Sequence, residues 1–259
     1  MADPLYTITH SRVQAFFQCR KKYWFEYLSD LPKPEDPMNA PGIIGKGVHH
    51  AMKVLCDTGE QADAAHELDV YLRMPDHEQV GPGTPGHGLA FSILARGFEA
   101  HDAIDSEDRW AELDTWVAWP ARGISVRALI DRVDRMDALH WQVIDWKTGL
   151  SGRDDVTDAQ LDLGHLAARV CKKLPREATV TAIAWNLRSD TRRVRKLTRE
   201  DGRATMRKYA SLARRIQETA DFSASPGPHC AYCRWRPQCP DAEQSEGADW
   251  DEELDEEEV

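Results

Sequence analysis

The chain has 259 residues, of which 41% are hydrophobic and 30% charged, so it can build a sizeable core and is not a low-complexity or fibrous sequence. No apolar run is long enough to span a bilayer, and the first residues lack the basic and apolar regions of a secretory signal. We therefore expect a cytoplasmic protein without a membrane segment.

The net charge of −11 comes from one end of the chain. Residues 241–259 hold eleven of the 44 acidic side chains and no basic one, which leaves 33 acidic and 33 basic side chains in residues 1–240. A neutral body does not exclude a nucleic-acid partner, because binding then depends on local basic patches. We expect one domain over residues 1–240, followed by a disordered acidic tail.

The first half of the chain predicts helices. Apolar residues at helical spacing predict an amphipathic helix over residues 9–28. A Gly-rich segment leads into a second helix over residues 42–59, which ends at Gly59. Residues 74–88 are rich in Pro and Gly and predict a loop, and a third helix follows to about residue 105.

The second half predicts a sheet. Three extended segments rich in Val, Ile, Thr and Trp predict a meander of strands at residues 113–119, 124–136 and 140–148. A helix, two strands and a long basic helix follow at residues 158–172, 179–187, 192–197 and 199–220. This order predicts an α/β fold with a mixed sheet.

The meander carries the charged residues of greatest interest. Asp131 ends the apolar part of one strand, and Asp145 and Lys147 lie two apart on the next strand, so they share a face of the sheet. Two carboxylates on rigid strands predict a site for Mg²⁺ or Mn²⁺, and a lysine can stabilise a developing phosphoryl oxyanion. Alone, Asp-x-Lys is equally typical of a surface ion pair, and we interpret Asp134, which lies between two arginines, as such a pair.

The ordered set of residues resembles a known family. Asp131 followed by Asp145-x-Lys147 resembles the PD-(D/E)XK nuclease superfamily, and the version here looks like its RecB-type branch. In that branch a Gly-x-x-x-His helix lies upstream, which matches the motif ending at His49. A glutamine motif lies downstream on a helix, which matches Gln160. The resemblance implies a restriction-endonuclease-like core, a mixed sheet with flanking helices, preceded by a helical N-terminal part.

The resemblance also implies a role for each residue. The implied metal ligands are His49, Asp131 and Asp145, while Lys147 would be the catalytic lysine and Gln160 would position the substrate or the lysine. Two alternatives stay open: His50 competes with His49 as the metal ligand, and Gln160 could belong to a capping box with Thr157. The sequence also departs from the family at Gly164, where the family has a tyrosine.

Three cysteines follow the spacing Cys-x2-Cys-x5-Cys: Cys230, Cys233 and Cys239. In a reducing compartment such clusters indicate metal ligands before disulfides, and a zinc ion or an iron–sulfur cluster usually takes a fourth thiolate. A subgroup of the RecB-type branch carries a four-cysteine iron–sulfur cluster with one cysteine near the N-terminus. It includes the CRISPR-associated family-four exonucleases and the AddB-type helicase-nucleases, and Cys19 matches the lone cysteine.

The resemblance therefore implies a structural 4Fe-4S cluster that ties the ends of the body together, with zinc as the alternative. Cys56 and Cys171 fall on apolar-patterned helices, and we expect them to be core thiols.

A basic stretch covers residues 188–215, with eleven Lys or Arg residues against three acids. Charge runs are usually solvated, but phosphates bind basic groups and unpaired bases stack on exposed aromatics. Because Arg234, Trp235 and Arg236 lie in the nearby cysteine segment, we predict a path for single-stranded DNA along these residues.

Together these features predict a metal-dependent DNA exonuclease that acts on single-stranded ends, with 5′ to 3′ polarity by resemblance. Its setting would be recombination, repair, phage DNA metabolism or CRISPR adaptation, with a protein of such a pathway as a partner. Two alternatives are a non-catalytic DNA-end-binding subunit and a zinc-stapled interaction protein.

Overall fold

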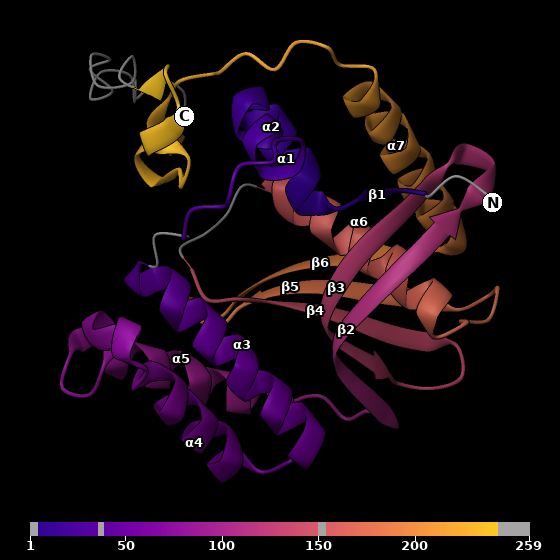
Figure 1. Ribbon diagram of the computed structural model, residues 1–259. Helices are drawn as coiled ribbons and strands as arrows, with labels where there is room; N and C mark the ends of the chain where they lie inside the picture. The colour runs from indigo at the N-terminus through magenta and orange to yellow at the C-terminus, as the bar shows by residue number, and fades with distance from the viewer. Residues whose placement is uncertain (1–4, 36–38, 150–153, 243–259) are drawn as a thin grey trace, which may run out of the picture. The chain divides into compact units, whose positions relative to one another are not determined.

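The computed structural model describes residues 5–35, 39–149 and 154–242 (Figure 1). The chain forms two compact units. Unit 1 comprises Met1–His10 and Met38–Ala213, and unit 2 comprises Ser11–Pro37 and Arg214–Val259. Within the described residues, no helix has the length and apolarity needed to cross a membrane.

A six-stranded mixed sheet forms the centre of unit 1. Its strands are β1 (Tyr6–Ile8), β2 (Asp108–Trp119), β3 (Ile124–Arg135), β4 (His140–Lys147), β5 (Thr179–Asn186) and β6 (Thr191–Leu197). The order is β1-β3-β4-β5-β6, with β2 also paired to β3. β2, β3 and β4 are an antiparallel meander, and β4 pairs with β5 in parallel across a helical connection. The α/β fold with a mixed sheet is confirmed.

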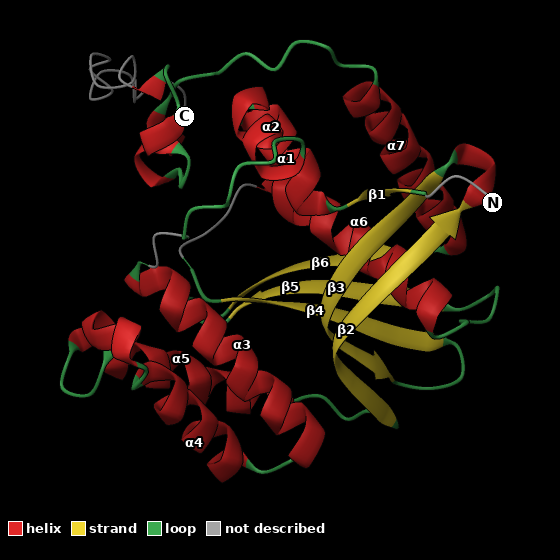
Figure 2. Ribbon diagram, in the orientation of Figure 1, coloured by secondary structure: helices red, strands yellow, loops and turns green. Residues whose placement is uncertain are grey.

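Helices flank this sheet (Figure 2). They are α3 (Ala40–Thr58), α4 (Gln61–Leu72), α5 (Pro85–Asp102), α6 (Asp154–Cys171) and α7 (Arg199–Gln217), with short 3₁₀ turns η1 (Pro75–Val80) and η2 (Pro120–Arg122). The α3–α5 group packs on one face of β4 and β5, through Ile144 and Trp185 among others. Helix α6 packs on the other face, where Leu161 meets Ala182 and Ala184. The alternation of side chains along each strand explains this three-layer arrangement.

Local signals set the ends of α3. The side chain of Asn39 accepts a hydrogen bond from the backbone N–H of Gly42 at 3.0 Å, which caps the first turn. Gly59 ends the helix with φ of 77°, a left-handed conformation that favours glycine. The predicted end at Gly59 is confirmed. Helix α4 and strand β1 were not predicted, because β1 has only three residues and the apolar pattern of α4 is weak.

The predicted loop at residues 74–88 is more ordered than expected, because it contains η1 and the start of α5 at Pro85. Proline suits both positions, since the first turn of a helix has no use for its missing N–H.

A charged pair that we interpreted as a surface pair is buried. Asp134 is 0% exposed and Arg132 is 1% exposed. The guanidinium of Arg132 donates two hydrogen bonds to the carboxylate of Asp134, at 2.7 and 2.8 Å. Ser106 donates a third at 2.9 Å, and a ring nitrogen of His101 lies 2.9 Å from Arg132. The surface interpretation is wrong, because the sequence did not show that α5 covers this part of β3.

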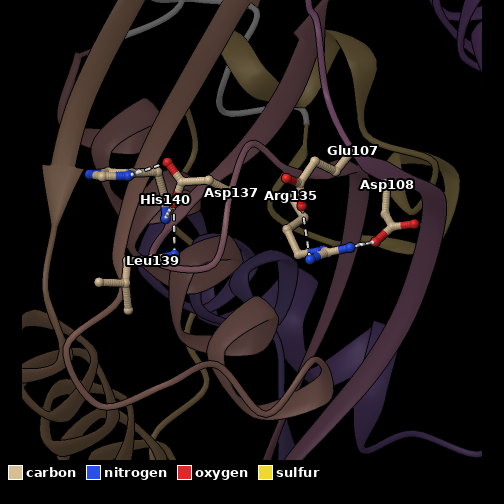
Figure 3. A network of polar contacts seen from close by, with 6 residues as sticks. All are labelled: Glu107, Asp108, Arg135, Asp137, Leu139 and His140. Carbon is tan, nitrogen blue, oxygen red and sulfur yellow. Dashed lines mark hydrogen bonds and ion pairs between the residues drawn. The ribbon is translucent and has the colours of Figure 1, made fainter.

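Exposed polar contacts fasten the ends of the meander (Figure 3). Arg135 at the end of β3 donates to Asp108 at the start of β2, at 2.7 Å. In the β3–β4 turn, the carboxylate of Asp137 accepts the backbone N–H groups of Leu139 and His140, each at 2.8 Å. This side-chain turn fixes the register with which β4 returns along β3.

Unit 2 contains α1 (His10–Gln18) except its first residue, together with α2 (Arg20–Tyr27), η3 (Pro228–Tyr232) and η4 (Arg236–Gln238). The single helix predicted over residues 9–28 is wrong: the chain breaks at Cys19, which has extended dihedral angles and caps α2. Trp235 is 0% exposed, stacks on Phe25 with ring centroids 5.0 Å apart, and donates to Glu26 at 2.8 Å. It is therefore a core residue of unit 2 and not an exposed platform for bases.

Candidate active site

Asp131 on β3 is the centre of a line of carboxylates across three strands. By the register of the two antiparallel ladders, Glu112 on β2 and Asp145 on β4 lie opposite Asp131. Regular pairing is interrupted at the Glu112 position and ends, toward Asp145, at the pair of Arg132 with Ile144. Like charges placed directly opposite one another destabilise a sheet. The three facing carboxylates therefore lower the stability of the sheet unless a cation compensates their charge.

The Asp131 carboxylate is held from two sides. Its Oδ2 accepts the backbone N–H of Trp146 at 2.7 Å, and its Oδ1 lies 3.4 Å from Nδ1 of His49 on α3. His50 instead places its ring 5.5 Å from the ring of Tyr71. Of the two neighbouring histidines, His49 is therefore the one that meets the carboxylates.

Glu112 is a candidate site residue that sequence analysis missed. Ligand atoms of His49, Glu112 and Asp131 lie within 4.8 Å of one another, the one such trio found in the described residues. Glu112 has φ of 49°, a left-handed conformation that costs about 1–3 kcal/mol for a residue with a side chain. The signal that could have revealed it is the register: counting back from the turn that joins β2 and β3 places Glu112 opposite Asp131.

Asp145 belongs to a second part of the site. Its Oδ2 lies 2.7 Å from Nζ of Lys147, as expected for two side chains on one face of β4. Lys147 also donates to Oε1 of Gln160 on α6 at 2.8 Å. The capping-box alternative for Gln160 is wrong, because α6 begins at Asp154 and Thr157 lies inside the helix.

Close packing explains why glycine stands at position 164, where the family has a tyrosine. A Cβ atom at this position would lie 3.1 Å from a methyl group of Val143 on β4. Helix α6 therefore approaches the sheet closely here, and a large side chain would require it to move. The neighbouring His165 is buried, and burial together with Arg169 lowers its pKa to about 4, so it is neutral at neutral pH.

The electrostatics of the site favour a cation. Burial raises the pKa of Asp145, and Asp131 raises it further against the opposing effect of Lys147. Burial and Asp131 likewise raise the pKa of Glu112. Burial alone would lower the pKa of His49, but its hydrogen bond to Asp131 and the surrounding carboxylates raise it. The raised pKa of His49 shows that the neighbouring carboxylates outweigh burial there, and three carboxylates with an imidazole fit a divalent ion such as Mg²⁺ or Mn²⁺.

A further histidine lies near the lysine. Burial, Lys147 and Lys208 lower the pKa of His10 to about 4, so its ring is neutral at neutral pH. Its Nδ1 lies 3.2 Å from the hydroxyl of Tyr209. Sequence analysis gave no indication that the first helix would bring a histidine to Lys147.

The cysteines form a separate feature in unit 2. Four of them line one pocket: Cys19, Cys230, Cys233 and Cys239. The backbone N–H of Lys22 donates to the sulfur of Cys19 at 3.5 Å, and that of Gly227 donates to the sulfur of Cys230 at 3.4 Å. Among the described residues, no three of these four sulfurs all lie within 4.8 Å of one another.

The remaining two cysteines differ from each other. Cys56 is buried on α3, as expected, and burial raises the pKa of its thiol. Cys171 is exposed at the end of α6, so its assignment to the core is wrong.

Comparison with known proteins identifies the family. The family model of the PD-(D/E)XK nuclease superfamily matches residues 7–240. A crystal structure described as "Putative exonuclease" from Eubacterium rectale shares the fold, with a TM-score of 0.53 and 13% identity over 82% of this chain and 80% of that chain. The crystal structure of SSO0001 has a TM-score of 0.37 and 17% identity over 86% of this chain and 94% of that chain. No curated protein sequence matches the chain. The match over residues 7–240 spans most of the chain, which therefore belongs to the PD-(D/E)XK nuclease superfamily.

Proposed function

We propose that the protein is a metal-dependent DNA exonuclease that digests single-stranded ends, with 5′ to 3′ polarity as the resemblance to RecB-type nucleases implies. The observation that carries this proposal is the line of Glu112, Asp131 and Asp145 across the meander, with Lys147 beside it. Because the chain belongs to the nuclease superfamily, the reaction that we assign to this cluster is hydrolysis of a phosphodiester bond.

The residues that would hold the metal are His49, Glu112, Asp131 and Asp145. A bound Mg²⁺ or Mn²⁺ would polarise the phosphodiester and lower the pKa of a coordinated water. The imidazole in the set favours tolerance of Mn²⁺, because nitrogen ligands suit softer ions than Mg²⁺.

Lys147 supplies the fixed positive charge. Its Nζ is held between the carboxylate of Asp145 and the amide oxygen of Gln160, so the ammonium group needs little reorganisation to meet a charged phosphate. Donors that are already oriented toward developing negative charge lower the barrier most. In this scheme Gln160 positions the lysine, and the neutral His10 adds no competing charge.

We further propose that the four-cysteine pocket holds a structural iron–sulfur cluster. The four cysteines line one pocket of unit 2, and backbone N–H groups donate to the sulfurs of Cys19 and Cys230, which supports a group held by thiolates at this place. A role in recombination, repair, phage DNA metabolism or CRISPR adaptation is consistent with this assignment.

The test uses end-labelled single strands with Mn²⁺, Mg²⁺ or a chelator. Wild type should release short products from the labelled 5′ end, and Asp145→Asn should release none. Asp114→Asn is the matched control, because Asp114 is a carboxylate of the same sheet that pairs with Arg127 in solvent. Cleavage of closed circular strands would contradict an exonuclease, and undiminished digestion by Asp145→Asn would contradict the proposed site.

A further inference from the structure

A large groove lies between the end of β2, helix α6 and the first half of α7. Its volume is about 940 Å³. Six arginines and no acidic residue line it: Arg122, Arg169, Arg176, Arg199, Arg203 and Arg207. Between them lie apolar side chains, including Trp119, Leu166 and Met206. The groove thus combines concentrated positive charge with an apolar floor.

Most of this charge is not compensated inside the groove. Arg203 and Arg207 share Glu200, which is not part of the lining. In the part of the chain that the structure describes, Arg122 and Arg199 have no ion-pair partner. Burial and the neighbouring Arg199 lower the pKa of Arg169, as expected where guanidinium groups crowd together.

Two arginines of the predicted basic stretch that lie outside the groove form ion pairs with α6. Arg193 pairs with Asp158 at 2.9 Å, and Arg195 pairs with Asp162 at 2.7 Å, both on α6. These two strand residues therefore pair with acids on α6 and do not line the groove.

The groove and the candidate metal centre share two elements. Along β2, Val117 in the groove lies five residues from Glu112, or about 17 Å at strand spacing. Along α6, Leu166 in the groove lies six residues from Gln160, or about 9 Å at helical spacing. A nucleic-acid strand with one phosphate at the metal centre would reach the groove within a few nucleotides.

We infer that this groove binds single-stranded DNA a few nucleotides away from the bond that is cut, an inference that rests on the proposed function. The exposed arginines contact phosphates through their planar donor forks, and Trp119 with the apolar floor contacts the unstacked bases. Arg169 instead donates to backbone carbonyl oxygens and adds only its charge. The positive charge of the groove would also bind an acidic protein segment. The shared path with the metal centre along β2 and α6 favours the strand.

The test compares binding of a labelled oligothymidine by the full-length protein in chelator, over a series of salt concentrations. The variant Arg122→Gln with Arg199→Gln removes two exposed charges from the groove. The matched control, Arg127→Gln with Arg135→Gln, removes two charges that pair with acids outside it. Loss of two phosphate contacts should weaken binding about tenfold and lower the slope of log K against log salt by about 1.4.

Equal affinity and slope in the groove variant and the wild type would overturn the inference. Loss of binding to a polyglutamate peptide with unchanged DNA binding would also overturn it, in favour of an acidic protein partner. Digestion of labelled DNA by the wild type with Mn²⁺ is measured in parallel. Absence of that digestion counts against the proposed function, whereas digestion with unaltered DNA affinity of the groove variant counts against the groove alone.

Discussion

The ammonium nitrogen of Lys147 lies 2.7 Å from Oδ2 of Asp145. Even with this cation so close, burial and Asp131 keep the pKa of Asp145 above its ordinary value. Lys147 therefore does not offset the cost of burying the Asp145 carboxylate beside Asp131, and a bound divalent cation would lower that cost.

Replacing Lys147 by Gln should separate metal binding from catalysis. The variant removes the fixed positive charge but leaves the carboxylates and His49 in place, so the rate constant should fall about 10²- to 10³-fold while Mn²⁺ still binds. Asp145→Asn should lose both properties. The rate is measured on labelled single strands under single-turnover conditions, and binding is measured by the rise in Tm with Mn²⁺. Full activity of Lys147→Gln would contradict its assigned role.

Neutralising Glu112 should stabilise the metal-free protein. Because burial and Asp131 raise its pKa in the folded state above the ordinary 4.5, its contribution to stability is complete below pH 4.5 and is lost as pH rises through the folded pKa. At neutral pH the charged form therefore destabilises the fold. Glu112→Gln should raise the Tm of metal-free protein at neutral pH, and this difference should shrink as pH falls.

The same variant should respond less to metal. For the wild type, Mn²⁺ at about 100 times its Kd stabilises the fold by about 2.7 kcal/mol. Glu112→Gln should gain less at the same concentration, because one ligand has lost its charge. A metal-free Glu112→Gln protein that is less stable than the wild type at neutral pH would show that the carboxylate has a different partner.

The sheet was predictable because its signals are local. Runs of Val, Ile and Trp identify β2, β3 and β4, and the two-residue period brings Asp145 and Lys147 to one face. The positions of Asp131 and Asp145 on adjacent strands follow from the same pattern.

Features that depend on tertiary packing were not predictable in this way. Glu112 enters the site through register and a left-handed backbone, and the sequence pattern reports neither. Trp235 lies between two arginines in the sequence, which suggested an exposed residue that stacks on bases, but its ring stacks on Phe25 inside unit 2. Cys19 interrupts an apolar pattern that otherwise continues at helical spacing, so periodicity alone conceals the break between α1 and α2.

Cys19→Ser should remove the proposed cluster. The wild type, purified without air, should be brown and contain iron and acid-labile sulfide in equal amounts, and the variant should lose most of both. Cys171→Ser is the control, because Cys171 is an exposed thiol of unit 1 outside the pocket. A colourless wild-type protein that contains zinc would contradict the cluster and favour a zinc site.

The buried pair of Arg132 and Asp134 should be among the most sensitive positions of unit 1. Asp134→Ala leaves a guanidinium buried without its carboxylate, which costs about 3–5 kcal/mol in the free energy of unfolding. Asp114→Ala breaks an exposed pair with Arg127 and should cost about 1 kcal/mol or less. Urea unfolding followed by tryptophan fluorescence measures both, since unit 1 contains the stacked pair Trp110 and Trp141. Equal losses in the two variants would mean that Arg132 finds another partner or water when Asp134 is removed.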